Sequence, residues 1–89
     1  MRKAIVAPPI MRGAEIREAR ASLGEMWGKG EPLTMNELGR LLGLASASPG
    51  RTVGEWERDQ RPAPGPVVVA IKLMLAGAFP PNMFKILRL

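Results

Sequence analysis

The chain has 89 residues, contains no cysteine or histidine, and carries a net charge of +5 from thirteen Lys and Arg against eight Asp and Glu. This length supports one domain with a modest core. The missing residue types exclude disulfides, Cys or His metal sites, a nucleophilic cysteine and the usual general base at neutral pH. We therefore expect no catalytic residues, no metal and no cofactor, and we do not expect an enzyme.

Residues 1–11 contain a double proline and show no sustained periodicity. Proline disfavours helix in the residue before it, so we expect a flexible N-terminal arm. The same prolines interrupt the short apolar run and make it a poor signal peptide. No apolar run in the chain approaches the roughly 18 residues of a membrane span. We expect a cytoplasmic protein without a membrane partner.

A first helix is predicted from about Arg12 to Leu23, with Ile16 and Ala19 on the same face as Leu23. Glycines then interrupt residues 24–33, which we expect to form a loop.

The second helix is predicted to begin at Thr34, because Thr34 and Glu37 have the spacing of a capping box. Gly39 leaves room for another helix to approach, and Gly43 is placed to end the helix. After a loop of small residues, Ser48 can cap a third helix over residues 49–59, with proline in its first turn.

The third helix is expected to bury Val53 and Trp56 together, three residues apart. Gly54 costs this helix about 1 kcal/mol relative to alanine, so we expect a close backbone approach there.

A fourth helix is predicted over residues 66–76, with Gly77 as its stop. It is apolar almost all round, so one side is expected to face a partner. The expected core positions are Val67, Ile71, Met74, Leu75 and Ala78. Residues 80–89 form an apolar tail, expected to pack on the fourth helix or on a dimer partner. The expected oligomer or partner interface comprises Val68, Leu73, Phe79, Phe84 and Leu87.

Four segments resemble the Xre/Cro-type helix-turn-helix family of phage repressors and bacterial regulators: EIREAR, LTMNELGRLLGL, RTVGEWERDQRPAPG and VVVAIKLMLAGAF. The resemblance covers residues 13–79. It implies an all-α, lambda-repressor-like fold, a compact domain of four to five helices over residues 12–79 with a central helix-turn-helix.

In this family the third helix lies in the major groove and the second helix meets the DNA backbone. By position, the resemblance implies these base-reading residues: Ser48, Arg51, Thr52 and Glu55. Arg can bind guanine bidentately, Thr can contact several bases and Glu can accept from cytosine. The implied phosphate contacts are Thr34, Asn36, Arg40, Arg58 and Arg61. The resemblance also pairs Glu57 with an arginine of the first helix, Arg20, in a structural role alongside Val53 and Trp56.

The leading hypothesis is a sequence-specific transcriptional regulator, a repressor that binds double-stranded DNA as a homodimer. The alternative is a protein-binding module on the same fold, such as an antiactivator or antitoxin. Four features motivate the alternative: the lengthened turn over residues 44–51, the zero net charge of residues 51–61, Gly54 within the third helix, and the apolar fourth helix with its tail.

Overall fold

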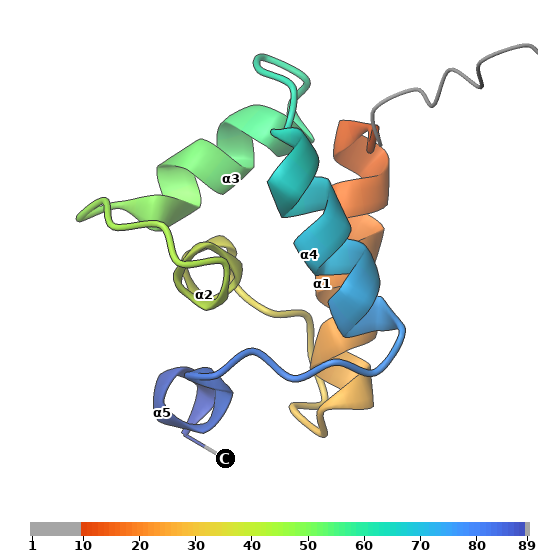
Figure 1. The fold of residues 1–89 in the computed structure, drawn as a ribbon, viewed down its shortest axis with the longest axis vertical. Coiled ribbons are helices and arrows are strands. Elements are labelled where there is room, and N and C mark those ends of the chain that lie inside the picture. The colour runs from red at the N-terminus through yellow and green to blue at the C-terminus, as the bar shows by residue number, and fades with distance from the viewer. Residues whose placement is uncertain (1–9, 89) are drawn as a thin grey trace, which may run out of the picture.

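The computed structural model describes residues 10–88, and the expected arm at residues 1–9 lies outside them. The described residues form five α-helices and no strand, so the all-α class is confirmed (Figure 1). No helix in this range is both long and apolar enough to cross a bilayer. The helices are α1 (Gly13–Met26), α2 (Met35–Leu41), α3 (Pro49–Glu57), α4 (Gly65–Leu75) and α5 (Met83–Leu87).

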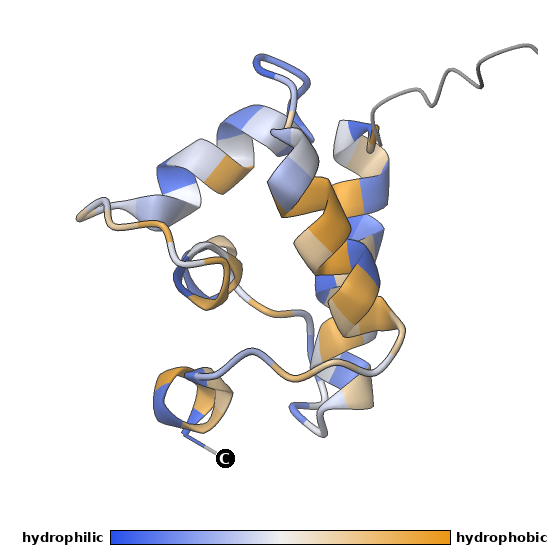
Figure 2. Cartoon of the chain, in the orientation of Figure 1, coloured by the Kyte–Doolittle hydropathy of each residue, from blue (hydrophilic) through white to orange (hydrophobic). Residues whose placement is uncertain are grey.

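The core lies where α1 meets α3 and α4, and α2 closes it by packing against α3. Val53 and Trp56 are buried as expected, at 0% and 4% exposure. Hydrophobic residues run along α4, whereas α3 is largely hydrophilic (Figure 2). The fully buried aliphatic side chains are Ile16, Leu23, Leu33, Leu38, Val53, Val68 and Ile71. One continuous core therefore holds α3 by its apolar side and leaves its polar side outside.

The first helix is longer than the sequence predicts. α1 continues to Met26, past Gly24, which was expected to interrupt it. Gly24 is buried within the helix, and a Cβ there would overlap the carbonyl oxygen of Glu31. This glycine therefore serves the close passage of the following chain, and the connection to α2 is correspondingly shorter.

α2 ends as predicted at Gly43, whose φ of +81° favours glycine. The amide of Leu44 donates to the carbonyl of Gly39 at 3.0 Å, and the amide of Gly43 donates to the carbonyl of Arg40 at 3.0 Å. These two bonds form a Schellman motif. α3 ends in the same way with Asp59 at the left-handed position, φ 56°.

α2 and α3 are in close contact at Gly39, where a Cβ would lie 2.6 Å from the Cβ of Pro49. This confirms the close approach expected at Gly39. At Gly54 the expected backbone approach is absent: the nearest atoms are the side-chain ends of Arg58 and Met35. Gly54 therefore leaves space for two flexible side chains rather than for a neighbouring helix.

Two expectations about the C-terminal half are wrong. Val68 was assigned to an exposed interface, yet it is fully buried, because the inward side of α4 runs through Val68, Ile71 and Met74. Ala78, expected in the core, is exposed. Within the chain, α5 packs against α2 rather than on α4, anchored by Met83, which is 4% exposed.

Candidate nucleic-acid interface

The outer side of α3 presents the residues predicted to read bases. Positions 48, 51, 52 and 55 follow the pattern i, i+3, i+4, i+7, so they share one side of the helix. Arg51 is exposed, whereas Thr52 and Glu55 are half-buried. Arg58 continues the same side one turn further and is also exposed. The structure therefore brings the base-reading candidates together on one surface.

The inner side of α3 holds a buried ion pair. Glu57 Oε2 lies 2.5 Å from Arg20 Nε, and Glu57 Oε1 accepts from Arg20 Nη2 at 2.9 Å. Side-chain exposure is 1% for Glu57 and 14% for Arg20. A bidentate guanidinium–carboxylate pair is the strong form of this contact. The pair expected from the sequence is present and joins α1 to α3.

Arg20 also donates from Nη1 to the carbonyl of Leu33 at 2.7 Å. This bond ties the segment before α2 to the same guanidinium. Arg17 adds a second, longer contact to Glu57 at 3.6 Å. The guanidinium of Arg20 in α1 thus bonds both α3 and the segment before α2.

Asp59 is directed towards α1 and away from the outer side of α3. Its Oδ1 accepts from the amide of Gly13 at 2.9 Å, one of the free amides at the start of α1. A carboxylate at a helix N-terminus is favoured by the helix dipole. A Cβ on Gly13 would overlap the Glu57 carbonyl oxygen, so α1 starts in close contact with the end of α3.

These contacts change the electrostatics of residues 51–61. The three acids in this segment balance its three arginines in number, but Glu57 is buried against Arg20 and Asp59 bonds α1. Only Glu55 remains near the outer side, 25% exposed and 4.0 Å from Arg61. The outer side therefore carries more positive than negative charge, although the segment is neutral overall.

The start of α3 is capped by α2 rather than by Ser48. Ser48 occupies the N-cap position, but its side chain makes no capping bond, contrary to expectation. Instead, Asn36 Oδ1 accepts from the amide of Gly50 at 2.8 Å. Asn36, expected to contact phosphate, therefore has a structural role at the α2–α3 junction, and the residue is still exposed there.

The start of α2 has the predicted capping box. Thr34 Oγ1 accepts from the amide of Glu37 at 3.0 Å, and Glu37 Oε1 accepts from the amide of Thr34 at 2.7 Å. Lys29 Nζ lies 2.5 Å from the same carboxylate oxygen. Burial raises the pKa of Glu37, but the bonds from Lys29 and Thr34 and the Lys29 charge outweigh it, so the pKa falls below its ordinary value.

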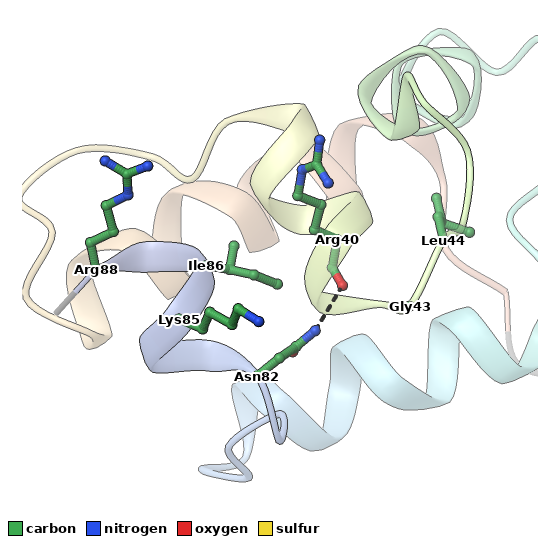
Figure 3. A pocket seen from close by; sticks show the side chains of 7 residues that line it. All are labelled: Arg40, Gly43, Leu44, Asn82, Lys85, Ile86 and Arg88. Carbon is green, nitrogen blue, oxygen red and sulfur yellow. Dashed lines mark hydrogen bonds between the residues drawn. The ribbon is translucent and has the colours of Figure 1, made fainter.

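The remaining phosphate candidates lie at two separate places. Arg61 follows α3 and is 74% exposed. Arg40 lies near the end of α2, where it borders a surface pocket of about 670 Å³ shared with α5 (Figure 3). Lys85 and Arg88 line the same pocket. Sequence reasoning assigned residues 80–89 an apolar role and missed these two cations: Lys85 lies on α5, and Arg88 directly follows it.

The expected partner interface is only partly exposed. Leu73 is 55% exposed, and Phe79 and Phe84 are each 67% exposed. Leu87 is half-buried and packs against the core, and Val68 is fully buried. The Phe79 ring is tilted against that of Trp27, with centroids 6.5 Å apart. Three large apolar side chains of the expected set therefore remain at the surface.

Comparisons with protein-family models, curated proteins and solved structures find no match to this chain. The functional argument therefore depends on the residues and their geometry.

Proposed function

We propose that this protein is a sequence-specific DNA-binding regulator in which α2 and α3 form a helix-turn-helix and α3 enters the major groove. The observation that carries the proposal is the division of charge on α3. Glu57 of α3 and Asp59 after it are engaged with α1, while Arg51 and Arg58 remain exposed on the outer side beside the half-buried Glu55. A positive, outward helix side held by a rigid core is what groove binding requires.

The arrangement at the start of the two helices supports the proposal. The bond from Gly50 to Asn36 brings the first turn of α2 beside the first turn of α3. In a helix-turn-helix, one helix crosses the backbone while the N-terminal residues of the other contact base edges. Arg51 and Thr52 would then read bases, and Thr34 and Arg58 would contact phosphates.

A homodimer is part of the proposal. The exposed apolar residues Leu73, Phe79 and Phe84 provide surface for a second copy. A two-fold dimer would contact two half-sites about one helical turn apart. A repressor would act by occupying a promoter.

The test is selection of a duplex from a random library, followed by anisotropy titrations. Arg51→Ala should weaken binding to the selected site by about 5- to 150-fold, corresponding to roughly 1–3 kcal/mol for a bidentate base contact. Its affinity for random DNA should fall much less. Lys72→Ala, an exposed cation on α4, is the matched control and should leave the specificity ratio unchanged.

If the selection enriches no sequence, or if an enriched duplex binds no more tightly than random DNA, sequence-specific binding is refuted.

The alternative function, a protein-binding module, is favoured by the exposure of Leu73, Phe79 and Phe84. Under that alternative, Phe84→Ser should abolish a stoichiometric complex with a protein partner, and Arg51→Ala should leave that complex intact.

A further inference from the structure

The pocket between α2 and α5 brings together three exposed cations from separate parts of the sequence. Arg40 comes from α2, Lys85 from α5 and Arg88 from the residue that ends α5. None of the lining residues has a carboxylate side chain. Within residues 10–88, none of these cations lies within 4.0 Å of a side-chain carboxylate oxygen. The pocket therefore concentrates positive charge that the described part of the chain does not neutralise.

α5 is held in place by its contacts with α2. Met83 is buried at 4% exposure, and Ile86 is half-buried against the core. The side-chain amide of Asn82 donates to the Arg40 carbonyl at 3.4 Å, joining the start of α5 to the end of α2 (Figure 3). Lys85 thus projects from a packed helix and Arg88 from the residue that ends it, which positions their charges relative to Arg40.

The chain connects the pocket with α3. Leu44 lines the pocket and lies in the connection from α2 to α3. In Figure 3 the side chains of Arg40 and Arg88 extend to the same side of the pocket. The pocket therefore lies next to the segment that leads into α3.

We propose that this pocket binds DNA backbone phosphate beyond the base pairs contacted by α3, with Lys85 and Arg88 joining Arg40 as phosphate contacts. This inference rests on the proposed DNA-binding function. Backbone phosphate is the chemistry that fits, because the site is exposed and cationic and no lining residue has a carboxylate side chain that would repel a phosphate. Such contacts position a duplex without reading its sequence.

The test measures salt dependence with the full chain. Each phosphate contact contributes about 0.9 to the slope of log K against log salt. The variant Lys85→Gln/Arg88→Gln should lower that slope by about 2. Its loss of affinity between about 50 and 200 mM salt should therefore be roughly tenfold smaller than that of the wild type. The change should be the same for selected and random duplexes.

The single variants Lys85→Gln and Lys72→Gln form a matched pair, since both remove one exposed lysine. Only Lys85→Gln should lower the slope, by about 1. All variants should retain the wild-type thermal midpoint, because the replaced side chains are exposed.

If the wild type selects a site and Lys85→Gln behaves like Lys72→Gln, the pocket proposal is wrong and the proposed function stands. If DNA binding is unspecific but still weakened by the α5 variants, sequence reading fails and the pocket is supported. No DNA binding at all would overturn both.

Discussion

The two sides of α3 carry charge in opposite ways. On the inner side, Glu57 is 1% exposed and bound bidentately by Arg20. On the outer side, Arg51 and Arg58 are exposed and, within residues 10–88, have no carboxylate oxygen within 4.0 Å. The helix is nine residues long, so orientation rather than sequence position separates the two groups. The net charge summed over residues 51–61 therefore misrepresents the charge that a ligand meets on the outer side of α3.

The two sides also differ in what removal of a charge should do. A buried ion pair loses the hydration of both partners, so its net contribution to stability is small. Removing one partner alone leaves a buried charge without compensation, which is costly. Exposed arginines are hydrated with or without a ligand, and their removal should hardly change folding.

The largest effect is therefore expected at the inner side. Arg20→Met should lower the free energy of unfolding by about 3–5 kcal/mol, because Glu57 stays buried without its partner and Leu33 loses a donor. Chemical denaturation followed by far-ultraviolet circular dichroism measures this loss.

The double variant Arg20→Met/Glu57→Leu is the control for that prediction. It removes both charges together, so it should recover much of the stability lost by Arg20→Met alone. If the double variant were as unstable as the single one, the packing of the arginine, rather than its charge, would explain the loss.

A second contrast separates two buried glycines of the helix pair. Gly39→Ala should destabilise the protein by about 1–3 kcal/mol, because its Cβ would press on Pro49, including the backbone. Gly54→Ala meets only the mobile ends of Arg58 and Met35, and alanine improves helix propensity by about 1 kcal/mol. It should be neutral or stabilising. Thermal denaturation compares the two, and an equal loss in both would mean that α3 is packed as tightly at Gly54 as at Gly39.

Local signals in the sequence were sufficient where the chemistry is local. The capping box at Thr34, the stop at Gly43 and the buried pair Val53 and Trp56 each depend on residues within one turn or two, and all three are present. The Arg20–Glu57 pair spans 37 positions and was reached only through a family resemblance.

Partners that are distant in sequence explain the errors. Ser48 was assigned the cap of α3, but the amide of Gly50 donates instead to Asn36 Oδ1, fourteen positions earlier in the chain. Asp59 was counted as a charge on α3, although it bonds the start of α1 across 46 positions. α4 is apolar almost all round, so periodicity did not distinguish the buried Val68 from the exposed Leu73. Tertiary contacts decide each case.

An intermediate effect is expected at the start of α2, where Glu37 is 22% exposed and Lys29 is 18% exposed. The pKa of Glu37 in the folded protein lies below its ordinary value, so its ionised form stabilises the fold. That contribution is complete above the unfolded pKa and disappears as the pH falls through the folded value. Glu37→Gln should cost about 0.5–1 kcal/mol at pH 7 and almost nothing well below pH 4. Denaturant unfolding curves of the wild type and Glu37→Gln between pH 7 and acid measure this difference in the free energy of unfolding. If the difference persists in acid, lost hydrogen bonds rather than the lost charge explain it.

The smallest effect on stability is expected at the outer side. Arg58→Ala removes an exposed side chain whose one side-chain bond in the described residues is a 3.3 Å contact to Gln60. The free energy of unfolding should change by less than about 0.5 kcal/mol. Under the proposed function, the same variant should lower the salt slope of DNA binding by about 1, as the loss of one phosphate contact requires. Chemical denaturation gives the free energy of unfolding, and anisotropy titrations of the same preparation give the salt slope. A stability loss as large as that of Arg20→Met would abolish the distinction between the two sides of α3, because it would place Arg58 among the residues that hold the fold.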